Sequence, residues 1–544
     1  MSSVILYICS LLLISTCALA QDVDRTMGLI LNSNKSLNGY TLFSPSANRT
    51  VYLVNNCGEL VHSWETDYQP GNAVYLQPDG TLWRAGRVQN QNIHAGGGGG
   101  VIEQLDWDSN VLWRFEYSTR NYRAHHDFQV LPNGNVLILA WVLKEEEEVL
   151  ANGRNPELLP DKELWPEQII EVKPVGLDQA EIVWEWNSWD HLIQDFDDTK
   201  LNYGVVSDHP EKIDINYIRP GVDGADWLHA NSIYFDQSRD QIMLSVLFFD
   251  EIWVIDHNST TEEARGKKGD LLYRWGNPQA YKKGTSADQM LFGQHNAYWI
   301  PEGLPDARQI MIFNNGRNRS PDEYTSVVKI DPHMIGDEFQ FLENGTYSPA
   351  DFSWEYTATP KESFFSRFIS GAQQLSNGNV LITDGAHGRF FEVDEKGETV
   401  WEYINPITVF GAAEQGTSLL NPVGDGINTV FRSTKYPFNY QAFVAKDLSP
   451  KGFIEIDNTG TNPCFVVLST EEDLTQKVFP NPAKDLLTVS DYHGRYAIYS
   501  LSGLAVSTGY LSNGIHSIDI SSLKAGVYLL MLDNQRRIRF IKEN

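Results

Sequence analysis

The sequence is short of basic side chains and of cysteine. Its 42 lysines and arginines face 71 aspartates and glutamates, which gives a formal net charge of −29. A surface this acidic repels the phosphate backbone, so we expect no nucleic acid partner. Only four cysteines occur in 544 residues, and the two beyond the first twenty, Cys57 and Cys464, lack the spacing of a metal site.

Long apolar runs are missing after the amino terminus. Residues 1–20 carry no charge and end in Ala18-Leu19-Ala20, which predicts a signal peptide cut before Gln21. No later stretch approaches the ~20 apolar residues of a membrane span. We therefore expect an exported protein, secreted or at the cell surface, with no membrane span. The sequence leaves open whether Cys57 and Cys464 pair once the signal is removed.

A repeated pattern runs through most of the chain. Its strand–turn–strand half carries Asn-Gly or Asp-Gly turns, as in LQPDGTLW and VLPNGNVLIL, which are hairpin signals. Its second half is an apolar strand ending in aromatic residues. This strand occurs around Trp64, Trp113, Trp184, Trp275, Trp354 and Trp401. Six copies at a period of roughly 40–50 residues are typical of a β-propeller. We predict an all-β fold, a six-bladed β-propeller with repeats between about residues 40 and 410.

The composition divides the chain into four segments. We expect a signal peptide (1–20), the propeller (21–465), a linker (466–477) and a small β-sandwich (478–544). Insertions at 143–168, 187–226 and 331–352 interrupt the repeats. Loops of this kind tend to build a site at one mouth of the fold, and we expect the acidic run Glu145–Glu148 to face solvent.

The last segment carries a recognisable set of motifs. It begins with Phe479-Pro480-Asn481-Pro482, contains the strand Gly526-Val527-Tyr528, and ends with a basic stretch that includes Lys542. It resembles the C-terminal sorting domain of type IX secretion. That resemblance implies export across the outer membrane, with the type IX secretion machinery as a partner.

Three histidines occupy similar places before the first strand of a repeat. They are His126 in YRAHHDFQV, His229 in DWLHANSIYFD and His295 in FGQHNAYWIP. Aligning the turns makes the three positions equivalent, so their side chains are expected to point into one central channel. Zinc ligation, nucleophilic and acid–base catalysis, and hydrogen bonding to the backbone at blade junctions are all compatible with this pattern.

A run of glycines, Gly96–Gly100, follows His94-Ala95. No lysine comes after it, and the next segment, VIEQLDW, has the pattern of a strand, so it is not a nucleotide-binding loop. We expect these glycines to let the backbone approach the channel closely.

The three histidine segments, with IMIFNNGRNR and SGAQQLSNGNVLI, resemble the bacterial arylsulfate sulfotransferases over residues 25–410. The resemblance implies a six-bladed propeller and ping-pong transfer of a sulfuryl group from a phenolic sulfate donor to a phenol acceptor. No nucleotide sulfate, cofactor or metal is expected. The nucleophile falls on His295, which becomes a transient sulfohistidine. His229 and Asn231 are expected to bind the sulfuryl oxygens and assist proton transfer, and His126 to face the same channel as a third catalytic histidine.

The sequence departs from the family pattern in one respect. The family has an arginine at a place that falls near Leu247, where QIMLSVLFFDEIWVID contains no basic residue. Arg317 is expected to bind substrate in its stead, with Arg319 and Arg389 as alternatives. Two other functions stay open: a metal-dependent hydrolase or lyase on a propeller scaffold, and a non-catalytic surface propeller that binds sulfated or phenolic ligands.

Overall fold

The computed structural model describes residues 25–456, 464, 478–490, 494–500, 505–511, 516–532 and 536–543. The predicted signal peptide and linker lie outside these ranges. The described chain consists mostly of strands and loops, with two short α-helices, α1 (Glu146–Ala151) and α2 (Thr261–Ala264), and some single turns of 3-10 helix. Neither α-helix is long or apolar enough to cross a membrane. The predicted all-β class is confirmed.

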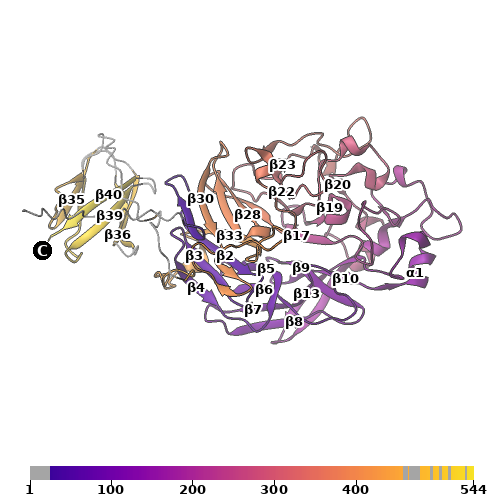
Figure 1. The fold of residues 1–544 in the computed structure, drawn as a ribbon, viewed down its shortest axis with the longest axis horizontal. Helices are drawn as coiled ribbons and strands as arrows, with labels where there is room; N and C mark the ends of the chain where they lie inside the picture. Colours follow the sequence, from indigo (N-terminus) through magenta and orange to yellow (C-terminus); the bar gives the residue numbers. More distant parts are fainter. Residues whose placement is uncertain are drawn as a thin grey trace, which may run out of the picture.

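Six antiparallel sheets of four or five strands follow one another along residues 28–437 (Figure 1). The first contains β33 (Val430–Pro437), β2 (Gly39–Pro45), β3 (Val51–Asn55) and β4 (Leu60–Trp64). The second contains β5 (Gln69–Leu76), β6 (Leu82–Arg87), β7 (Gly100–Leu105) and β8 (Val111–Glu116). The third contains β9 (Tyr122–Val130), β10 (Val136–Val142), β13 (Glu167–Val175) and β14 (Gln179–Asn187).

The remaining three sheets continue the same order. The fourth contains β17 (Ala230–Asp236), β18 (Gln241–Val246), β19 (Glu251–Asp256) and β20 (Tyr273–Trp275). The fifth contains β21 (His295–Trp299), β22 (Ile310–Asn314), β23 (Ser326–Ile330) and β26 (Trp354–Tyr356). The sixth contains β27 (Gly371–Gln374), β28 (Val380–Asp384), β29 (Arg389–Val393), β30 (Thr399–Ile404) and β1 (Gly28–Asn32). The six sheets correspond to the six repeats, and the propeller type of arrangement is confirmed.

The repeated tryptophan explains why the pattern recurs. The first five lie on the outermost strand of their sheets, and Trp401 lies on β30, one strand inside β1; the indole N–H of several of them reaches a loop of the next sheet. Trp113 donates to the carbonyl of Gln179 at 2.8 Å, and Trp401 of the sixth sheet donates to the carbonyl of Asn56 in the first at 3.0 Å. A buried indole needs such a partner, so the repeat both packs and connects neighbouring sheets.

The last strand of the propeller segment completes the first sheet, and the first strand completes the sixth sheet. β33 pairs with β2, with Tyr436 opposite Tyr40, and β1 pairs with β30. The repeats end before β33 and give no signal for it. Cys57, in the turn between β3 and β4, forms a disulfide with Cys464 across 407 residues of sequence, which answers the question that the sequence left open.

The insertions carry small elements of their own. They are β11 (Lys144–Glu145), β12 (Glu163–Leu164), β15 (Leu192–Ile193), β16 (Ile213–Asp214), β24 (Met334–Ile335) and β25 (Glu338–Phe339). A further short hairpin follows the sixth sheet, β31 (Ile407–Thr408) and β32 (Gly411–Ala412). The acidic run in the first insertion enters α1, with only Glu146 less than fully exposed, so the expected solvated face is confirmed.

The carboxyl-terminal strands form two sheets. One contains β34 (Val478–Phe479), β35 (Leu486–Val489) and β38 (His516–Asp519). The other contains β37 (Ala505–Leu511), β36 (Gly494–Ser500), β39 (Gly526–Leu532) and β40 (Arg536–Lys542). Leu487 of the first sheet and Leu530 and Phe540 of the second share one buried core. Two packed sheets are what the alternating pattern predicted.

Candidate active site

The central strands break their regular pairing where the histidines occur. His126 and His229 have positive φ angles of 48° and 51°, but in β21 the positive φ of 52° falls on Asn296. His295 itself pairs regularly with Phe313 of β22, and the bulge follows it. The alignment that made the three histidines equivalent is therefore wrong by one residue for His295. Positive φ is rare for residues other than glycine and concentrates at functional sites.

The structure nevertheless brings the three histidines together. The rings of His126 and His229 are 4.6 Å apart, centroid to centroid, and His295 is close enough that His229 lowers its pKa, after burial, and that His295 in turn lowers the pKa of His126. In each ring Nδ1 has a hydrogen-bond partner, whereas Nε2 has none within the described part of the chain. These three Nε2 atoms are not sealed from solvent. The site thus presents three anchored imidazoles with open Nε2 atoms.

The tautomer of His295 is fixed by Asn315. The Asn315 amide nitrogen donates to the carbonyls of Ser366 at 2.7 Å and Ile369 at 3.0 Å, so its oxygen must face the ring. Nδ1 of His295 lies 2.8 Å from that oxygen and therefore carries the proton. Burial lowers the pKa of His295 to about 3, with the positive charges of His229 and Arg432 acting in the same direction against the Asn315 hydrogen bond. Nε2 is left with a lone pair in a neutral ring.

His229 is held in the opposite state. Its Nδ1 hydrogen-bonds the carboxylate of Asp226, three residues earlier. Burial lowers the pKa of His229, but Asp226 and then Glu167 outweigh it, so that the pKa is raised above its ordinary value of 6.5. The His229 pKa is thus shifted in the direction opposite to that of His295, which favours the charged ring that a donor to an anion requires.

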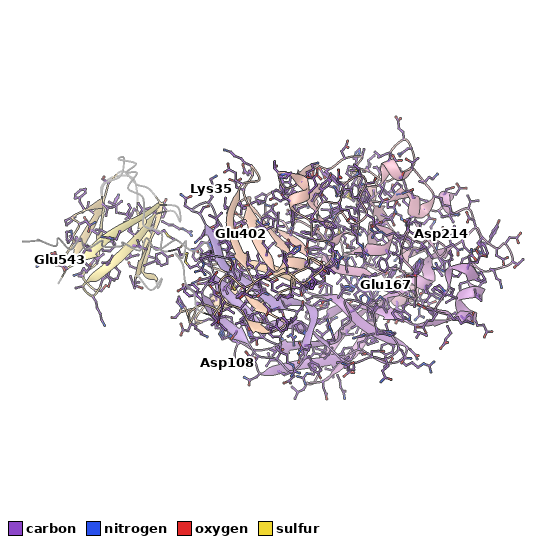
Figure 2. All side chains as sticks on the ribbon, viewed as in Figure 1. Lys35, Asp108, Glu167, Asp214, Glu402 and Glu543 are labelled. Atoms are coloured by element: carbon purple, nitrogen blue, oxygen red, sulfur yellow. A yellow bond between two sulfur atoms is a disulfide. The ribbon has the colours of Figure 1, made fainter. Side chains whose placement is uncertain are left out.

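His126 is anchored by a second imidazole. Its Nδ1 lies 2.9 Å from Nδ1 of His125, and Nε2 of His125 lies 2.8 Å from a carboxyl oxygen of Glu167. The other carboxyl oxygen of Glu167 accepts the backbone N–H of Ala230 at 2.7 Å. Trp141 stacks flat on His125 at 3.8 Å and shields this chain of contacts. Glu167 is labelled in Figure 2 and is 1% exposed.

Gly97 makes room for the His126 ring. A Cβ atom at this position would lie 2.0 Å from Nε2 of His126, and the φ of +78° also favours glycine. The backbone N–H of His126 donates to the carbonyl of Gly97 at 2.8 Å. The expected close approach of the glycine run to the channel is confirmed.

Asn231 lies behind the site. Its side-chain amide donates to the carbonyl of Gln294, the residue before His295, at 2.8 Å, and the side chain is fully buried. Its oxygen has no partner among the described residues, and an oxygen cannot donate a hydrogen bond to a sulfuryl group. The contact with Gln294 makes Asn231 a support for the His295 backbone.

Arg317 lies near His229, because its positive charge lowers the pKa of that ring, against the larger effects of burial and Asp226. Its side chain is exposed, and its guanidinium pairs with no group that the structure describes. Arg319 instead stacks on Tyr324 at 4.0 Å, and Arg389 pairs with Glu402 at 2.7 Å. Of the three arginines proposed from the sequence, Arg317 is the one with an uncommitted cation.

Two further arginines were missed by the sequence analysis. Arg219, from the second insertion, donates to the carbonyl of Leu247 at 3.4 Å and to that of Arg317 at 2.9 Å. A cation therefore does lie near Leu247, but it comes from another segment. Arg432 of β33 pairs with Asp127 at 2.9 Å and contributes to lowering the His295 pKa, after burial and His229. Neither has a sequence signal, since both depend on which segments meet.

A separate cavity of about 560 Å³ lies among hairpin turns of the third to fifth sheets, lined by Tyr234, Trp299 and Arg308 among others. None of the three histidines lines it. No group of three or more histidine, cysteine, aspartate or glutamate side chains in the described ranges is arranged to hold a metal ion.

An all-β protein with a propeller arrangement and three anchored histidines is the class that these observations define. Residues 113–409, more than half of the chain, match the arylsulfotransferase family, and the range includes all three histidines and Arg317. The chain belongs to this family. Residues 477–543 match the secretion system C-terminal sorting domain, which implies export to a cell-surface or secreted location.

No curated protein matches the sequence. Among solved structures, a protein of unknown function from Bacteroides caccae is 12% identical with a TM-score of 0.39, covering 74% of this chain and 99% of its own. Virginiamycin B lyase from Staphylococcus aureus is 10% identical with a TM-score of 0.33, covering 72% and 87%. The β-propeller domain of Myceliophteria thermophila Cps50 is 9% identical with a TM-score of 0.33, covering 71% and 88%. At TM-scores this low, these likenesses carry no argument about function.

Proposed function

We propose that this protein transfers a sulfuryl group from a phenolic sulfate ester to a phenol through a transient sulfohistidine on His295. The observation that carries the proposal is the pair of opposite anchors in one cluster. Nδ1 of His295 faces the amide oxygen of Asn315 and its pKa is lowered, whereas Nδ1 of His229 faces the carboxylate of Asp226 and its pKa is raised, which favours a cation there. A nucleophile and a cation side by side are what displacement at an anionic centre needs.

The first half-reaction uses the lone pair of His295. Nε2 attacks sulfur in line with the phenolic oxygen; the N–S bond forms as the S–O bond breaks, and the phenoxide leaves. The N–H on Nε2 of His229 and the free guanidinium of Arg317 would bind the sulfuryl oxygens as charge spreads over them. Sulfuryl transfer resembles phosphoryl transfer in that positioning and charge stabilisation supply most of the catalysis.

The second half-reaction reverses the first. A phenol replaces the departed product and gives up its proton to a base in the site as its oxygen attacks sulfur, and the N–S bond breaks to restore neutral His295. Asn231 supports this exchange indirectly, because its bond to the carbonyl of Gln294 holds the backbone that carries His295. The kinetics are ping-pong because the first product leaves the site before the acceptor phenol binds there.

The test uses 4-nitrophenyl sulfate with and without added phenol. We expect a burst of nitrophenol equal to the enzyme, followed by turnover that accelerates with phenol, and a peptide containing His295 that carries one SO3 group. His295→Asn abolishes the burst. His257→Asn is the matched control, because His257 is half-buried and held at both ring nitrogens by carboxylates, those of Asp240 and Glu171, but lies outside the cluster. A burst that persists in His295→Asn refutes the assignment, and release without phenol dependence indicates hydrolysis.

A further inference from the structure

Glu167, His125 and His126 form a continuous line of hydrogen bonds that ends in the active site. The line joins a carboxyl oxygen to Nε2 of His125 at 2.8 Å, and Nδ1 of His125 to Nδ1 of His126 at 2.9 Å. His125 is bonded through both of its ring nitrogens, whereas His126 is bonded through Nδ1 and its Nε2 stays open. Three titratable groups in series can pass a proton over a distance that no single group spans.

The line exists in two states that differ by one proton. In the first, Glu167 is ionised and accepts from His125, His125 accepts from the Nδ1–H of His126, and Nε2 of His126 has a lone pair. In the second, Glu167 is protonated and donates to His125, His125 donates to Nδ1 of His126, and Nε2 of His126 carries hydrogen. Every hydrogen bond is satisfied in both states, and Glu167 accepts the N–H of Ala230 in both.

We propose that Glu167, His125 and His126 are a proton relay that gives a proton to the departing phenoxide and takes it back from the acceptor phenol. The inference rests on the proposed sulfuryl transfer. In the first half-reaction Nε2 of His126 donates its proton to the phenoxide, Nδ1 receives the proton of His125, and His125 receives that of Glu167, which ends as a carboxylate. In the second half-reaction the phenol gives its proton to Nε2, and the same three transfers run backwards.

The surroundings favour the uncharged state of the relay, which is the state that precedes the first half-reaction. Burial raises the pKa of Glu167 well above its ordinary value and lowers the pKa values of His125 and His126 well below theirs. The charged groups that face the relay are Asp226 and His229 before β17, Arg123 on β9 and Arg432 on β33, together with the titratable His295 on β21. His229 can then stay cationic on the sulfuryl oxygens through both steps.

The first test compares two donors on the same variant. Phenyl sulfate releases a phenol with a pKa of about 10, as in tyrosine, whereas nitrophenol needs little protonation to leave. In Glu167→Gln the relay cannot pass a proton, so we expect transfer from phenyl sulfate to fall about 100-fold, the lower end of general acid catalysis, while transfer from nitrophenyl sulfate falls less than about fivefold. The ratio of the two rates does not depend on the fraction of folded enzyme.

The matched control is Glu171→Gln. Glu171 lies on β13, as Glu167 does, and also bonds a histidine, His257, at 3.0 Å, but it has no contact with the catalytic cluster. We expect its ratio of the two rates to equal that of the wild type. An unchanged ratio in Glu167→Gln overturns the relay even if sulfuryl transfer is established.

The second test needs no activity. With 15N-labelled histidine, the ring nitrogen signals of His125 and His126 are expected to change together in one pH-dependent step in the wild type. In Glu167→Gln, as in His126→Asn, His125 loses that step. Coupled signals in a protein that transfers no sulfuryl group would retain the relay and refute the proposed function. Independent titration of the two rings would refute the relay.

Discussion

Replacing Asn315 with alanine isolates the contribution of the His295 tautomer. The substitution keeps the nucleophile but removes the acceptor, 2.8 Å from Nδ1, that keeps the proton off Nε2. A hydrogen bond of this kind contributes a net ~0.5–1.5 kcal/mol, which corresponds to a loss of up to about tenfold in the productive tautomer. Loss of this hydrogen bond also lets the ring move, and a displacement of about 1 Å lowers the reaction rate up to ~100-fold. We expect the first half-reaction to slow by about 10–100-fold.

The assay is the burst rate constant of nitrophenol release in the absence of acceptor. It measures the rate at each competent site and is therefore insensitive to the amount of folded enzyme. Asn405→Ala is the matched control, because the Asn405 amide also donates to two carbonyls, of Ile407 at 3.2 Å and Asn428 at 2.8 Å, without touching a histidine. The control should lose a similar amount of stability and keep the wild-type burst rate. Equal burst rates in Asn315→Ala and the wild type would refute the tautomer argument, as would equal slowing in both variants.

Three further outcomes follow from the geometry. Gly97→Ala should reduce activity more than tenfold, because the added methyl would lie 2.0 Å from an imidazole nitrogen; Gly134→Ala, with a φ of +85° and nothing within 4 Å, should cost only the ~1 kcal/mol of backbone strain, seen in thermal unfolding. The raised pKa of His229 means that its cation is present below that pKa and lost as pH rises through it, so activity should fall on the alkaline side, above the ordinary imidazole pKa, and His229→Gln should lack this limb in its pH–rate profile. Serine at both Cys57 and Cys464 should lower the free energy of unfolding by about 2–4 kcal/mol and remove its sensitivity to reductant; sensitivity that remained would contradict the pairing.

The repeats predicted the fold because their signals are local. An Asn-Gly turn and an outer-strand tryptophan act within one sheet and its neighbour, so reading them in order yields the succession of sheets. β33 was missed because it contains no repeat: its residues pair with β2, almost 400 positions earlier in the sequence, and nothing in VFRSTKYP indicates that partner. The disulfide was left open for the same reason, since it joins residues 57 and 464.

The sequence identified the histidines of the candidate site but not their hydrogen-bond partners or their pKa shifts. His126, His229 and His295 were identified from their place before a strand, but the one-residue offset of His295 depends on a bulge that no spacing reveals. Asn315 could have been noticed in the Asn-Asn-Gly turn, and Asp226 as an acidic residue three positions before His229. Glu167, Arg219 and Arg432 reach the cluster only through the folded arrangement of the sheets.

The three rings of the candidate site have different anchors. Zinc ligation by three histidines requires a lone pair from each ring. Asp226 accepts at Nδ1 of His229 and leaves Nε2 able to bind a metal, as carboxylate-bound histidines commonly do, while Asn315 frees the lone pair of His295, so the metal content of the purified protein, and not these contacts, separates the two functions. A binding surface for sulfated ligands needs donors, but it does not need a neutral imidazole placed against a cationic one. In the proposed function, one residue type with an amide, a carboxylate and a second imidazole as its three partners serves as nucleophile, cation and proton carrier for the exchange of a sulfuryl group between two phenols.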